Sequence, residues 1–172
     1  FNGPEQYPED ELIDVLRGFG ASFGADINAS TSFDETVYSL TVPNDDDSLG
    51  TGLNVLDQWL SHATFDPAQV EAERGIVLDE WRTRTQTPDG RLSDSSQALY
   101  LAGSAYEGRS PIGTDAAIGS VTRDELKLFY DTWYRPDNAA LVVVGDVDVD
   151  AVVADLTGRF GDAVPRTGAM PA

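Results

Sequence analysis

Residues 66–85 read DPAQVEAERGIVLDEWRTRT, and this stretch says most about the fold. Asp66 is a good N-cap and Pro67 suits the first helical position. The pattern predicts a helix over residues 67–85 that ends before Pro88, because the residue before a proline disfavours helical geometry. The chain is therefore expected to contain a long helix with a defined start and end.

Two glutamates lie seven residues apart on this helix. Helical projection places Glu73 and Glu80 on one side, with Ile76 and Val77 between them, at the border of the apolar stripe. Ionised carboxylates next to a core are costly unless they pair or bind a cation. Two interpretations stay open: a pair of solvated or salt-bridged acids, or a metal ligand with a second acid that supports the site.

Hydrophobic spacing predicts further elements on both sides of this helix. Alternation predicts antiparallel strands over residues 22–28 and 35–42, joined near Phe33 and Asp34. The continuous apolar run 139–144 is typical of a strand buried on both faces. Helical periodicity predicts helices over residues 10–20, 49–60, 90–102, 122–134 and 150–160.

Length and composition indicate one globular domain. The chain has 172 residues, of which 41% are hydrophobic and 24% charged, enough apolar material for a core. The C-terminal residues carry several prolines and glycines, as linkers do. We expect one unit over residues 1–164 and the start of a linker over residues 165–172.

Composition also excludes several classes of function. Eleven Lys and Arg against thirty Asp and Glu give a formal charge of -19, which repels phosphate backbones and anionic lipid. No apolar run approaches the roughly 18–20 residues of a membrane-spanning helix. We therefore expect neither a nucleic-acid partner nor a membrane.

Metal chemistry is constrained by the same counts. The chain has no cysteine and one histidine, so it cannot build a multi-histidine zinc site by itself. That histidine, His62, stands at the end of a predicted helix, where we expect a capping or surface role.

Short blocks of aromatic, small and charged residues follow one another along nearly the whole chain: Phe1-Asn2-Gly3, residues 23–26, residues 28–38, Glu73-Arg74-Gly75, Glu80-Trp81-Arg82, Pro111-Ile112-Gly113 and residues 129–138. In this order the blocks resemble the insulinase, or pitrilysin, family of zinc metallopeptidases, family M16. The resemblance implies an α+β fold, a mostly antiparallel sheet covered by helices, as in the LuxS/mitochondrial-processing-peptidase-like metallohydrolases.

The resemblance also implies a zinc endopeptidase that acts on peptides or small unfolded proteins. Two histidines and a general-base glutamate of the family come from a His-x-x-Glu-His helix just before the Phe-Asn-Gly block, and the present sequence begins at Phe1 without it. By motif matching, Glu80 corresponds to the downstream zinc ligand and Glu73 to the acid that supports the site. No catalytic residue is assigned to this chain, and we expect it neither to hold zinc tightly nor to be active alone.

Substrate and partner expectations follow from the same resemblance. Asn28, Ala29, Ser30 and Thr31 match the edge strand that binds the peptide substrate in the family, and a second unit, on the same or another chain, supplies further groups. The first alternative is a non-catalytic family member that serves as a structural or partner subunit. The second is an acidic interaction module, which explains the charge but not the ordered blocks.

Overall fold

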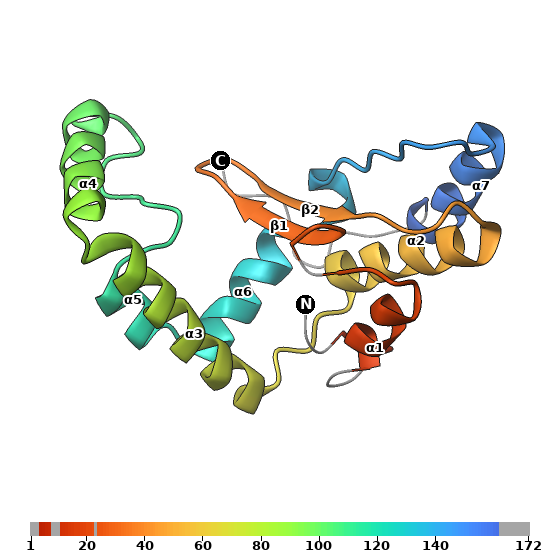
Figure 1. Cartoon of the computed structure of the whole chain (residues 1–172), viewed down its shortest axis with the longest axis horizontal. Helices are drawn as coiled ribbons and strands as arrows, with labels where there is room; N and C mark the ends of the chain where they lie inside the picture. Colours follow the sequence, from red (N-terminus) through yellow and green to blue (C-terminus); the bar gives the residue numbers. More distant parts are fainter. Residues whose placement is uncertain (1–3, 8–10, 23, 162–172) are drawn as a thin grey trace. The chain divides into compact units, whose positions relative to one another are not determined.

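The computed structural model describes residues 4–7, 11–22 and 24–161. The chain divides into two units, unit 1 within residues 1–28, 39–65 and 124–172, and unit 2 over residues 29–38 and 66–123. The Phe1-Asn2-Gly3 block, Phe23 and the expected linker over residues 165–172 lie outside the described residues. The elements are α1 (Glu11–Gly18), β1 (Ile27–Thr31), β2 (Thr36–Leu40), α2 (Asp46–Ser61), α3 (Pro67–Thr85), α4 (Pro88–Leu101), α5 (Asp115–Ser120), α6 (Arg123–Trp133), the 3-10 helix η1 (Pro136–Asn138) and α7 (Val149–Phe160). Figure 1 labels all of them except η1.

Unit 1 holds the buried apolar side chains of the described residues. They come from α1, the start of β1, α2, α6 and α7: Leu12, Leu16, Ile27, Leu53, Val55, Trp59, Tyr130 and Val152. Helix α2 supplies three of them, and it begins at a cap in which Asp45 Oδ1 accepts from the backbone N–H of Ser48 at 2.8 Å. That hydrogen bond lowers the pKa of Asp45. Mixed helices and strands confirm the expected α+β class.

Strands β1 and β2 form a two-stranded antiparallel hairpin, the one sheet among the described residues. The predicted strand over residues 22–28 is wrong in its first half. Ser22 and Asp26 close a turn there, because the Ser22 N–H and Oγ–H both donate to Asp26 Oδ2 at 2.9 Å. Regular pairing therefore begins only at Ile27, whose side chain is buried.

Unit 2 consists of α3, α4, α5 and the hairpin tip, and none of its described residues is buried. The helices start at side-chain caps: Asp66 Oδ1 accepts from Ala68 N–H and Gln69 N–H, and Thr87 and Thr114 act in the same way for α4 and α5. The bounds predicted for α3 are confirmed. Beside its two glutamates Ile76 is 60% exposed, and both glutamates are exposed as well, which agrees with the alternative of solvated or salt-bridged acids.

The apolar run 139–144 does not form the predicted buried strand. No regular element is assigned to it, and Val142 and Val144 are 79% and 90% exposed. The physical reason is that no strand among the described residues pairs with it. Helix α5, by contrast, was not expected from the sequence.

No helix of the described part of the chain combines the length and the apolar character that a bilayer crossing requires.

Candidate functional site

Glu80 lies in the second half of α3 and faces solvent. Its Oε1 is 2.5 Å from Nη2 of Arg84 one turn later, and the two side chains are 46% and 65% exposed. Exposed ion pairs of this spacing contribute only about 0.3–0.5 kcal/mol. The Glu80 carboxylate is therefore held weakly and can exchange Arg84 for a stronger cation.

Glu73 lies two turns before Glu80 on the same side of α3 and is also exposed. It has no ion-pair partner in the part of the chain that the structure describes. Seven residues of helix correspond to about 10 Å along the axis. Helical side chains all lean toward the N-terminus, so the two carboxylates do not converge and cannot easily ligate one ion together. Their spacing is therefore compatible with different roles for the two acids.

Arg74, next to Glu73, fixes α3 against α5. Its Nη1 donates to the carbonyl of Ile118 at 2.5 Å and its Nη2 to the carbonyl of Val121 at 2.7 Å, at the C-terminal end of α5. Both carboxylate oxygens of Glu71 accept hydrogen bonds from the same guanidinium, and these bonds lower the pKa of Glu71. In the sequence, Arg74 stands out only as part of the Glu73-Arg74-Gly75 block. The Glu71–Arg74 spacing of three residues hints at the pair but not at α5.

The candidate substrate strand, residues 28–31, is β1 without its first residue. Three of its side chains are exposed, those of Asn28, Ser30 and Thr31, and Ala29 is half-buried. Thr31 Oγ1 and Thr36 Oγ1 lie 3.3 Å apart across the hairpin. Small side chains on such a strand leave its backbone accessible from the side.

The hairpin tip is anchored within unit 2. The hydroxyl of Tyr106 donates to Asp34 Oδ1 at 2.8 Å, and the rings of Tyr106 and Phe33 are 5.0 Å apart. The hydrogen bond to Asp34 raises the pKa of Tyr106. This contact fixes the turn that joins β1 to β2, and with it the register of the strand.

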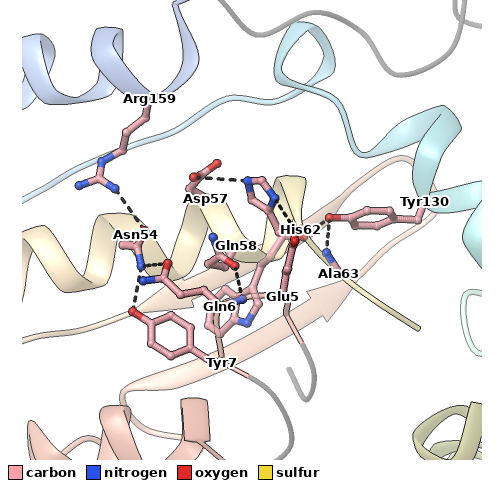
Figure 2. A network of polar contacts seen from close by, with 11 residues as sticks. Glu5, Gln6, Tyr7, Asn54, Asp57, Gln58, His62, Ala63, Tyr130 and Arg159 are labelled. Atoms are coloured by element: carbon pink, nitrogen blue, oxygen red, sulfur yellow. Dashed lines mark hydrogen bonds and ion pairs between the residues drawn. The ribbon is translucent and has the colours of Figure 1, made fainter. Parts of the chain in front are cut away.

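A polar network holds residues 4–7 on α2, as Figure 2 shows. The buried side chain of Gln58 accepts from the N–H of Gln6 at 3.1 Å. Asn54 Nδ2 donates to Gln6 Oε1 at 2.9 Å and to the Tyr7 hydroxyl at 2.8 Å. This segment, which leads back toward the start of the chain, is therefore fixed to the middle of α2.

His62 ends α2, as expected for a capping histidine. Its backbone N–H donates to the carbonyl of Gln58, while its ring nitrogens lie 3.6 Å from Glu5 Oε2 and 3.9 Å from Asp57 Oδ2 (Figure 2). No three His, Cys, Asp or Glu side chains come together as a metal site among the described residues. The exposed Glu80 carboxylate has the chemistry of one oxygen ligand of a zinc ion, and among the described residues it belongs to no group of three such side chains.

Two family models match the chain. Residues 1–108 match the model described as insulinase (peptidase family M16), and residues 120–168 match the model described as the peptidase M16 inactive domain. Together they cover most of the sequence.

Individual proteins agree with these matches. The chain is 39% identical to the probable zinc protease PqqL of Haemophilus influenzae over 97% of its own length and 18% of that protein. It is 36% identical to the Escherichia coli protein of the same description over 90% of its length and 16% of that protein. The crystal structure of the first half of the periplasmic protease PqqL from Escherichia coli superposes with a TM-score of 0.90 at 33% identity, covering 100% of this chain and 36% of that one. The chain thus spans about a sixth of each of these two PqqL relatives.

Proposed function

Because the chain belongs to the insulinase family of peptidases, family M16, we propose that it contributes to a zinc-dependent metalloendopeptidase that hydrolyses peptides or small unfolded proteins. The names of its relatives, zinc proteases, support this activity. The observation that carries most weight is Glu80, an exposed carboxylate on a rigid helix, at the position that the family motif gives to a zinc ligand.

In this proposal Glu80 holds zinc directly and Glu73 acts from a distance. A bound zinc ion would supply a Lewis acid and an activated water at the peptide carbonyl. Glu80 would leave Arg84 to bind the metal, and breaking this weak, exposed ion pair costs little free energy. Arg74 of the same helix joins α3 to α5 through the carbonyls of Ile118 and Val121.

In this proposal the substrate peptide would pair with residues 28–31 and so add a strand to the hairpin. Backbone pairing does not depend on side chains, so it suits an enzyme that accepts many peptide sequences. The small residues of β1 support this role, and the anchored hairpin tip keeps their register. A second M16-type unit would face the substrate from the other side, as the description of the Escherichia coli structure as a first half suggests for that relative. Within this chain we propose residues 1–164 as one truncated M16-type peptidase unit, which would include both compact units of the structure, and residues 165–172 as the start of a linker.

A second candidate function is a non-catalytic partner subunit. The match of residues 120–168 to the inactive-domain model favours it. Such a subunit has no need for a metal-binding carboxylate, so retention of both Glu73 and Glu80 favours the enzyme.

The deciding experiment uses an M16 peptidase that joins these 172 residues to a His-x-x-Glu-His segment. Glu80→Gln should abolish zinc binding and peptide hydrolysis, because a neutral amide replaces a charged ligand. Glu73→Gln should reduce zinc affinity or rate by about 10- to 100-fold without abolishing binding. Asp79→Asn, on another side of α3, is the matched control and should change neither.

The 172 residues alone should carry no stoichiometric zinc after dialysis, since one carboxylate ligand falls short of a catalytic site. Normal zinc content and turnover in Glu80→Gln would show that the ligand is another residue. One tightly held zinc per chain in the 172 residues alone would show that the site is built differently.

A further inference from the structure

Helix α7 lies beside α2 in unit 1. Its Val152 is buried, and Arg159 near its end donates to Asn54 Oδ1 of α2 at 3.4 Å (Figure 2). The two helices and the segments before them line a hollow of about 330 Å³, to which α2 contributes Leu49 and Leu53. Since Arg159 and Asn54 are 105 positions apart in the sequence, this arrangement exists only when unit 1 is folded.

Aspartates from both sides line the same hollow. They come from the cap and first turn of α2, from the segment before α7 and from α7 itself: Asp45, Asp46, Asp146, Asp148 and Asp155. Among the described residues that line the hollow, Arg159 is the one cation, and it already pairs with Asp155 at 3.0 Å. Folding thus gathers five carboxylates around one guanidinium, and like charges at short range repel.

Two of these carboxylates are fixed in place by helix caps. Asp45 Oδ1 accepts from the N–H of Ser48 at 2.8 Å, and Asp148 Oδ1 accepts from the N–H of Ala151 at 3.1 Å. The hydrogen bonds from Ser48 lower the pKa of Asp45, so this carboxylate stays ionised at neutral pH. The repulsion at Asp45 is therefore relieved neither by protonation nor by rotation of the side chain away from its cap.

Dissolved salt is the remaining means of lowering this repulsion. The distance over which charges interact falls from about 30 Å at 0.01 M salt to about 3 Å at 1 M salt. Unit 1 as a whole carries nineteen acidic and five basic residues, whereas unit 2 carries eleven and six. Salt should therefore favour the folded state of unit 1 more than that of unit 2.

We propose that unit 1 contains a salt-sensitive device: the aspartates that line this hollow loosen α7 from α2 at low ionic strength, and salt lets α7 pack. Ionic strength then sets how often α7 opens, and the identity of the cation has little influence. The inference concerns unit 1 alone and does not depend on zinc or on Glu80, so it can fail or hold independently of the proposed function.

Amide hydrogen exchange of the 172-residue chain measures the opening of α7, at pH 7 in about 0.01 M and about 1 M NaCl. We expect the hydrogen-bonded amides of α7 to exchange at least about tenfold more slowly at the higher salt concentration. The amides of α3, in unit 2, are the internal reference and should slow by less than about threefold. Equal slowing in the two helices would overturn the proposal, and so would the absence of protected amides in α7 at about 1 M NaCl.

The double variant Asp46→Asn/Asp146→Asn removes two of the five carboxylates. Both positions are exposed, and the salt effect on α7 should fall to about threefold or less. The matched control Asp89→Asn/Asp115→Asn removes the same charge from exposed positions of unit 2 and should keep the full effect. An equal loss of the salt effect in the two variants would overturn the proposal.

Calcium chloride separates screening from binding of one cation. At about 1 mM it adds little ionic strength, so it should slow exchange in α7 by less than about twofold. If this concentration slowed exchange as much as about 1 M NaCl does, the proposal would be overturned in favour of a specific cation site.

Discussion

Arg74 should be the side chain on which helix α5 depends. Helix α5 has six residues and no buried side chain, so its stability comes from its cap and from the two carbonyls that Arg74 binds, those of Ile118 and Val121. The Arg74 side chain is 15% exposed. A hydrogen bond to a charged group contributes about 1.5–3 kcal/mol. Since water can reach the freed carbonyls, we expect Arg74→Met to cost about 2–3 kcal/mol for the pair of bonds.

Amide hydrogen exchange measures this cost locally. If α5 opens as a unit, a loss of about 2–3 kcal/mol should speed exchange at Ile118 and Val121 by roughly 30- to 150-fold. Methionine keeps the apolar stem, so the change tests the guanidinium. Arg82→Met is the matched control on the same helix, because Arg82 pairs only with the exposed Asp79 among the described residues. It should change exchange in α5 less than about twofold. Equal exchange in Arg74→Met and the unmodified chain would refute the reasoning.

Two further predictions concern tyrosine hydroxyls. The hydrogen bond to Asp34 raises the pKa of Tyr106, so the stabilising effect of this bond is complete below the usual tyrosine pKa near 10 and is lost as the pH rises through the raised value. Asp34→Asn should lower the pH midpoint at which the absorbance of the Tyr106 phenolate appears. An unchanged midpoint would argue against the contact. Tyr130→Phe removes a buried hydroxyl that donates to the carbonyl of Trp59 and accepts from the N–H of Ala63. Urea unfolding should show that the free energy of unfolding falls by about 1–2 kcal/mol. The control Tyr100→Phe, at an exposed position, should lower it by less than about 0.5 kcal/mol.

Local sequence signals predicted α3 to both of its ends. Asp66 caps the helix and Pro67 starts it, and both act within a few residues of the positions they fix. Helix α5 escaped prediction because it is short and because the residue that holds its end, Arg74, lies more than forty positions earlier. Hydrophobic periodicity reports only on neighbouring residues, so it cannot reveal contacts over such sequence distances.

Strand predictions depended on partners that the pattern does not specify. The alternation over residues 22–28 looked like a strand, but the contact between Ser22 and Asp26 favours a turn. The run 139–144 has strand composition, yet composition alone cannot provide the neighbour with which a strand pairs.

The candidate site was only partly accessible from the sequence. Spacing placed Glu73 and Glu80 on one side of a helix, and that placement is confirmed. Their roles came from the family resemblance and stay predictions. Their exposure agrees with the alternative of solvated or salt-bridged acids, which the sequence alone could not decide because burial depends on what covers a helix.

The exposed apolar side chains of unit 2 affect the solubility of the chain. Helix α4 presents Leu92, Leu99 and Tyr100 to water, which favours sticking between molecules at high concentration. Thirty acidic residues counteract this by keeping like-charged molecules apart at neutral pH. Near the isoelectric point of about 4.1 that repulsion vanishes, and the chain should be least soluble there. The acidic composition thus works as a dispersant for an incompletely covered helix.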